Sequence, residues 1–186
     1  ADASTTDPAQ PFRGGQGDDM TYTRTSAEGR VILIGGKRVY WVTKPIMLYT
    51  HYSVSPKPVR ILAHGARVFG PLAVHPSGIK EVIGSKTRPE SWTAEFRQSS
   101  DTHKRWTVTH AATGLMLSAG GGNRKGFRHK RKAASFAEIL VEEFHEILSG
   151  LPTAGPPEQV IATLSSREGY DDMIVRIRSL EEELGQ

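Results

Sequence analysis

The segment GGGNRKGFRHKRK, residues 120–132, holds the densest group of side chains that could bind a ligand. Three glycines come first, and six bases follow: Arg124, Lys125, Arg128, Lys130, Arg131 and Lys132. A glycine-rich loop lets backbone N–H groups and basic side chains surround phosphates. The ring of Phe127 could stack on a base, as aromatic residues do in single-strand binders. The segment therefore predicts a nucleic-acid-binding loop, with a surface hairpin tip or a basic targeting run as alternatives.

Aromatic residues and bases also share the predicted strands. Along 37–43, Arg38 and Tyr40 alternate with Lys37 and Trp41, so each pair falls on its own face of a strand. One face could act as a stacking platform, although aromatic residues in strands more often belong to the core. The bases expected to extend the nucleic-acid site are Lys37, Arg38, Lys104 and Arg105.

Residues that could perform catalysis do not form a recognisable set. The seven histidines lack metal-ligand spacing, and the absence of cysteine excludes thiolate zinc sites. Glu142 and His145 form one Glu-x-x-His motif, whereas a di-iron bundle needs two. His110 ends a predicted strand before a turn, where a local hydrogen bond is expected. We therefore predict no catalytic residue, no metal and no cofactor.

The elements that must position the basic segment are predicted to be short strands. Gly35-Gly36 separates RVILI from KRVYWVT, which indicates a hairpin because both glycines accept positive φ. Further strands are IMLYTHYSV, VRILA, ARVFG, PLAVHPSG, KEVIG, SWTAEFRQ, RWTVTH and TGLMLSA. Such closely spaced strands favour an antiparallel sheet, open or curled into a partial barrel.

Helical periodicity begins after the basic segment. Apolar residues from Ala133 to Leu148 recur at helical spacing, which predicts a helix over 133–149 that caps the sheet. A short helix is expected over 158–164 and a last one over 169–184. The apolar seam of the last helix suits packing on the same domain or a homodimer contact.

Charge divides the chain into three parts. Residues 1–19 carry a net charge of −3, residues 20–137 carry +15, and residues 138–186 carry −8. A dense positive field attracts polyanions and is self-repulsive without one. The charge pattern and the predicted elements give an α+β fold with a disordered arm (1–19), a basic β-rich domain (20–150) and a small acidic helical appendage (151–186).

Composition excludes other classes. The chain has no apolar run long enough to span a bilayer, and its first residues lack the pattern of a signal peptide. We therefore expect a cytoplasmic protein with no membrane partner. The first hypothesis is a non-catalytic nucleic-acid-binding protein, with DNA and RNA equally open. The second is a protein–protein adaptor or assembly component of phage or plasmid type, and the third is an enzyme that acts on nucleic acid.

Overall fold

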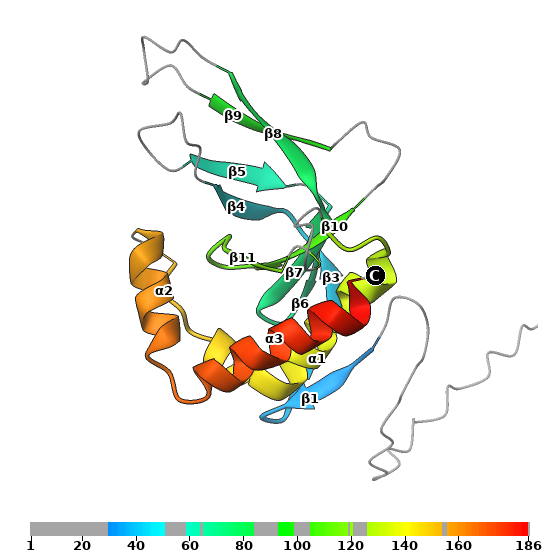
Figure 1. Ribbon diagram of the computed structural model, residues 1–186, viewed down its shortest axis with the longest axis vertical. Helices are drawn as coiled ribbons and strands as arrows, with labels where there is room; N and C mark the ends of the chain where they lie inside the picture. The colour runs from blue at the N-terminus through cyan, green and yellow to red at the C-terminus, as the bar shows by residue number, and fades with distance from the viewer. Residues whose placement is uncertain are drawn as a thin grey trace, which may run out of the picture.

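The computed structural model describes residues 30–50, 59–63, 65–83, 93–98, 105–118, 120, 126–153 and 156–185. These residues form an α+β fold in which antiparallel strands precede three helices (Figure 1). The predicted disordered arm, residues 1–19, lies outside the described residues.

The strands follow the predicted order along the chain. They are β1 (Ile32–Ile34), β2 (Lys37–Val39), β3 (Trp41–Thr43), β4 (Ile46–Thr50), β5 (Val59–Ala63), β6 (Arg67–Phe69), β7 (Leu72–Pro76), β8 (Gly78–Ile83), β9 (Thr93–Gln98), β10 (Trp106–His110) and β11 (Met116–Ser118). The predicted hairpin at Gly35-Gly36 is confirmed: both glycines have positive φ, 55° and 76°, as a primed two-residue turn requires.

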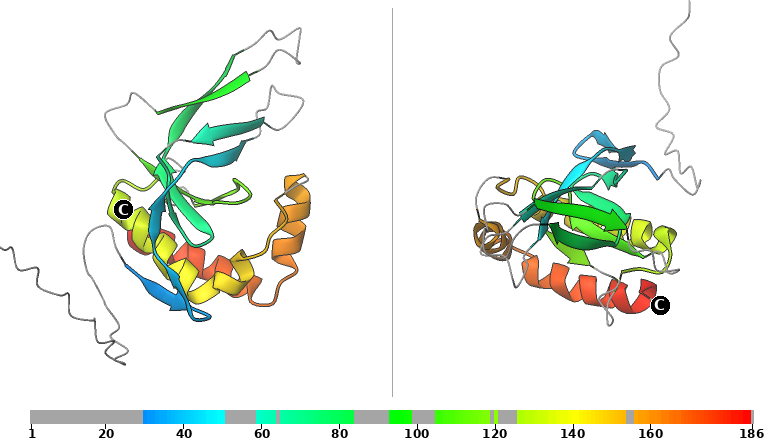
Figure 2. Two further views of the ribbon diagram at one scale, coloured as in Figure 1. Left: turned by 180° about the vertical axis from the view of Figure 1, so that it is seen from behind. Right: turned by 90° about the horizontal axis from the view of Figure 1, so that it is seen from above.

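One sheet forms the centre of the fold. Its strand order is β11-β10-β7-β6-β3, and β1–β2, β4–β5 and β8–β9 are separate antiparallel hairpins. The described strands do not close into a barrel. Figures 1 and 2 show the β4–β5 and β8–β9 hairpins on the side of this sheet that faces away from α1 (Lys130–Leu148) and α3 (Tyr170–Leu184).

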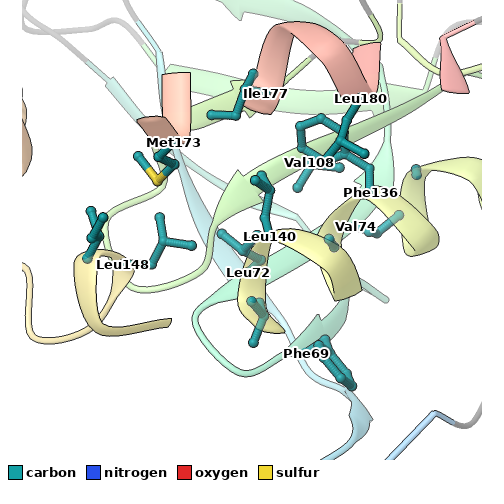
Figure 3. Close-up of a cluster of buried hydrophobic side chains, with 14 of the residues drawn as sticks. Phe69, Leu72, Val74, Val108, Phe136, Leu140, Leu148, Met173, Ile177 and Leu180 are labelled. Carbon is teal, nitrogen blue, oxygen red and sulfur yellow. The ribbon is translucent and has the colours of Figure 1, made fainter. Parts of the chain in front are cut away.

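The helices cover the other face of the sheet. Phe69, Leu72 and Val108 of the sheet are fully buried together with Phe136 and Leu140 of α1 (Figure 3). The α3 seam joins this core through Met173, Ile177 and Leu180. The seam considered for a homodimer contact is therefore already buried within the chain. The short helix α2 (Pro157–Ser165) precedes α3 and adds Val160 and Leu164.

The central strands β6, β7 and β10 are buried on both faces, because a second, smaller core lies under the β4–β5 hairpin. In β7, Leu72 and Val74 belong to the helix side, whereas Ala73 belongs to the smaller core. Ile46 and Leu48 of β4 complete the small core with side chains that are each 4% exposed. Successive residues along a strand thus point in turn into the main core on the helix side and into the smaller core under the β4–β5 hairpin.

Two side chains from distant elements cap the carboxyl end of α1. The Arg167 Nη1 group donates hydrogen bonds to the carbonyls of Glu146 (3.1 Å), Ile147 (2.7 Å) and Ser149, and Nη2 donates to Gly150 (3.2 Å). The last four carbonyls of a helix have no partner within the helix, and the negative end of its dipole attracts cations. Arg167 satisfies both requirements from the turn between α2 and α3.

His110 at the end of β10 supplies the remaining capping bond. Its Nε2–H donates to the Leu148 carbonyl over 2.7 Å, which leaves Nδ1 of the neutral ring as an acceptor for the Thr113 N–H at 3.3 Å. The local hydrogen bond expected of His110 is confirmed, and the bond to Leu148 adds a link from the sheet to the helix.

Candidate nucleic-acid interface

The two ends of the glycine-rich segment lie side by side. A Cβ atom on Gly120 would lie 2.8 Å from the carbonyl carbon of Gly126, and both glycines have positive φ, +78° and +105°. Phe127 then pairs with Trp106 through two backbone hydrogen bonds of 2.7 and 2.9 Å. This short pairing fixes the chain against β10 just before α1 begins. Arg124, Lys125 and Lys104 lie outside the described residues.

The prediction that residues 120–132 form one loop is wrong at its end, because α1 begins at Lys130. Lys130, Arg131 and Lys132 occupy the first helical turn, three residues ahead of the predicted start. Lysine and arginine are good helix formers, and the anchored Phe127 determines where the chain can turn into the helix. These three bases are therefore displayed on a regular element.

The expectation that Phe127 stacks on a base is also wrong. Its side chain is 0% exposed, and its ring centroid lies 5.3 Å from that of Phe136 in α1. A base could reach the ring only if this part of the core opened. A large apolar residue shortly before an amphipathic helix often packs on the first apolar turn of that helix, and this signal favours the buried position.

Five bases gather where β10 and the start of α1 meet, and we call them the basic cluster: Arg105, Arg128, Lys130, Arg131 and Lys132. Arg105 joins the others because its Cβ lies 2.9 Å from the position that a Cβ on Gly126 would take. The Lys130 ammonium lies 5.4 Å from the centroid of the Trp106 ring, in cation–π geometry. Arg128, Lys130 and Arg131 are exposed, whereas Arg105 and Lys132 are half-buried.

The start of α1 has the electrostatics of an anion site. His129, the N-cap residue, makes no side-chain hydrogen bond to the first turn, and that turn contains no acidic residue. The positive end of a helix dipole disfavours nearby cations, so Lys130 and Arg131 stand at the end where they stabilise the helix least. A phosphate at this place would interact favourably with both the helix end and the side chains.

The acidic end of α3 lies beside this region. Arg176 of α3 pairs with Glu143 of α1 over 2.9 Å, and Gly185 packs against Gly120, so the two helices run antiparallel. Figures 1 and 2 accordingly show the C-terminus next to the start of α1. Of the three consecutive glutamates, Glu181 accepts a hydrogen bond from Ser118 (2.5 Å), and Glu182 and Glu183 are exposed. Their negative charge offsets part of the field of the basic cluster.

Lys37 and Arg38 are exposed, but the structure does not bring them to the basic cluster. Their hairpin packs along the later part of α1, where a Cβ atom on Gly70 would lie 3.3 Å from Val39 and 3.2 Å from Val141. Lys130 and Val141 are 11 helical positions apart, which corresponds to roughly 17 Å at 1.5 Å per residue. The predicted basic sheet face is thus divided, with Arg105 at one place and Lys37 and Arg38 at another.

Neither a group of metal ligands nor a membrane-spanning helix is found in the part of the chain that the structure describes. It contains no group of three or more potential ligands from His, Asp and Glu. Glu142 pairs with Arg30, and His145 lies next to Ser149, so the Glu-x-x-His motif has structural contacts. Within these same ranges, no helix combines the length and hydropathy that a bilayer crossing needs.

Comparison with known proteins identifies no relative of this chain. No protein-family model matches the chain, and neither the curated sequences nor the solved structures contain a match.

Proposed function

We propose that this chain binds nucleic acid without catalysing a reaction, and that the basic cluster at the start of α1 is its phosphate-binding site. The observation that carries the proposal is the concentration of five bases around a helix N-terminus that has no side-chain cap and no acid in its first turn. Such an end binds the oxygens of a phosphate through both N–H groups and side chains.

The arrangement supports phosphate contacts more than base readout. Lys130 and Arg131 lie in the first turn of α1 and Arg128 lies just before it; all three are exposed, and no acidic partner holds them among the described residues. Lysine and arginine on phosphates provide affinity that depends on salt and little on sequence. We include Arg124 and Lys125, which precede Gly126 in the chain, in the same proposed site.

Substituting Gln at Arg128, Lys130 and Arg131 together should weaken nucleic-acid binding without loss of the fold. Each phosphate contact contributes about 0.9 to the slope of log affinity against log salt, so the slope should fall by roughly 2 to 3. Unfolding stability should change little or rise, since three cations leave the positive helix end. Fluorescence anisotropy with labelled oligonucleotides at several salt concentrations measures the slope.

The control removes an exposed base that belongs to neither the basic cluster nor the β1–β2 hairpin. Arg178→Gln takes away one exposed charge on α3 and should reduce the slope by much less than one third of the loss in the triple variant. If the folded triple variant kept the slope and affinity of the parent, the site assignment would be wrong. If the parent bound no nucleic acid at low salt, the proposed function itself would fail.

Neutralising the end of α3 should have the opposite effect on binding. Glu182→Gln with Glu183→Gln removes two exposed charges beside the cluster and spares Glu181, which bonds Ser118. We expect tighter binding at low salt, because less negative charge opposes the phosphates. Asp171→Asn with Asp172→Asn makes the same change in net charge at the far end of α3 and should tighten binding less. Equal effects of both pairs would indicate net charge alone and contradict local competition.

A further inference from the structure

The β1–β2 hairpin has an apolar surface that no described element covers. Ile32 and Ile34 of β1 and Val39 of β2 pack on the main core, whereas Leu33 and Arg38, which pair with each other in the register, lie on the opposite face of the hairpin. The alternation along the chain places Val31 and Tyr40 on that same outer face. Of the outward residues, Leu33 is 61% exposed, Tyr40 54% and Val31 42%. The first view of Figure 2 shows this hairpin at the edge of the molecule, beside α1. A solvated hairpin face normally alternates to polar residues, so three large apolar side chains here indicate a binding surface.

The charges around this surface restrict its partner. Residues 30–50 contain four bases and no acid. Arg30 is paired with Glu142 over 2.5 Å, but Lys37, Arg38 and Lys44 are exposed. Leu33 lies directly opposite Arg38 in the register, so apolar and cationic groups share one face. A second copy docked on this face by two-fold symmetry would bring like charges together, which disfavours self-association.

We propose that the outer face of this hairpin, formed by Val31, Leu33, Arg38 and Tyr40, stacks the bases of single-stranded nucleic acid. Nucleobases are flat apolar rings linked by phosphates, so they match an exposed aromatic ring beside cations. A duplex keeps its bases stacked internally and leaves none for Tyr40. This inference deepens the proposed function and rests on it: the basic cluster holds phosphates, and the hairpin face selects single strands.

The test compares single and double strands of one sequence. Tyr40→Ala should weaken binding to single-stranded oligonucleotides about 5- to 100-fold, which is the usual loss for one stacked base. Binding of the duplex should stay within about twofold, and Tyr40→Phe, which keeps the ring, should bind single strands almost as the parent does. The salt slope of Tyr40→Ala should equal that of the parent, because no phosphate contact is lost. Val175→Ala is the matched control, since this residue is 64% exposed on α3, away from the hairpin.

The outcomes separate the two proposals. If Tyr40→Ala bound single strands like the parent while the triple cluster variant lost its salt slope, the stacking inference would be overturned and the proposed function would stand. Equal losses on single strand and duplex would also overturn stacking. A parent protein that light scattering shows to be a dimer, and that Leu33→Ala or Tyr40→Ala makes monomeric, would replace the nucleic-acid partner with a second copy. A parent that binds neither substrate would defeat both proposals.

Discussion

Replacing Gly114 with Ala is expected to lower the free energy of unfolding by about 3–5 kcal/mol, from backbone strain and overpacking together. Gly114 has a φ of +74°, and a Cβ atom there would overlap the carbonyl oxygen of Met47 and lie 2.6 Å from the backbone nitrogen of Tyr49. The Gly114 carbonyl accepts a hydrogen bond of 2.8 Å from the Tyr49 N–H. The added methyl group would push β4 away from the turn after β10 and break this bond.

Gly65 provides the control that separates close approach from backbone conformation. Its φ is +70°, nearly that of Gly114, yet no described residue other than its chain neighbours lies within 4 Å of the position of its Cβ. Gly65→Ala should therefore lower the free energy of unfolding by only about 1–2 kcal/mol, the energy needed to hold an alanine in the left-handed conformation. Thermal unfolding measures both variants, and roughly 2–4 °C per kcal/mol is expected for a chain of this length. Equal melting temperatures for the two variants would contradict the tight contact between Gly114 and β4.

Much of the fold could be predicted from local signals in the sequence. The turn at Gly35-Gly36 needs positive φ at two consecutive positions, and few other residue pairs accept it. The apolar period from Ala133 onward predicted α1, whose buried residues Phe136 and Leu140 follow it. The start of the helix was missed by three residues because lysine and arginine fit both a helical first turn and a basic loop.

The candidate site was predicted only in part, because its geometry depends on long-range contacts. Phe127 became a core residue through its pairing with Trp106 and its packing on Phe136, and none of these contacts is local. Arg105 reaches the basic cluster only because β10 lies next to the chain before α1. Composition identified the bases as a dense group along the chain, whereas tertiary contacts decided which of them share one surface.

The capping of the carboxyl end of α1 by Arg167 could not be predicted from the sequence either. Arg167 lies almost twenty positions after Leu148 in the sequence. Its only distinctive feature there is that it is one of three bases in an acidic region. Its role comes from the turn between α2 and α3, which returns the chain to the end of α1. A guanidinium group can donate to several carbonyls at the end of α1 only because the chain folds back to that end. No local sequence pattern predicts this long-range contact.

Removing the Arg167 side chain should destabilise the fold by roughly 2–4 kcal/mol, since several charge-assisted hydrogen bonds to carbonyls are lost together. Arg167→Ala leaves the carbonyls of Ile147 and Ser149 without this donor, at a helix end that attracts positive charge. Arg178→Ala, an exposed arginine on α3, is the control and should change stability by about half a kcal/mol or less. Comparable losses in the two variants would refute the capping role.

The same helix end should make stability depend on pH through His110. Burial lowers the pKa of His110 below its ordinary value of 6.5; the bond to Leu148 acts in the opposite direction, and the charge of Arg167 lowers the pKa further. Between the lowered pKa and 6.5 the unfolded chain binds more protons than the folded chain. The contribution of neutral His110 is therefore fully present above pH 6.5 and is lost as the pH falls through the folded-state pKa.

Comparison with His110→Gln isolates this contribution from the other histidines. The glutamine amide can still donate to the Leu148 carbonyl but does not titrate. The stability advantage of the parent over the variant should shrink with acidification, by at most about 1.4 kcal/mol per pH unit for one proton. Arg167→Ala should make this decline shallower, because losing the nearby cation lets the pKa of His110 rise toward its ordinary value. Denaturant unfolding at pH 5 to 8 measures both effects, and a gap between parent and His110→Gln that stays constant over this range would refute the buried neutral histidine.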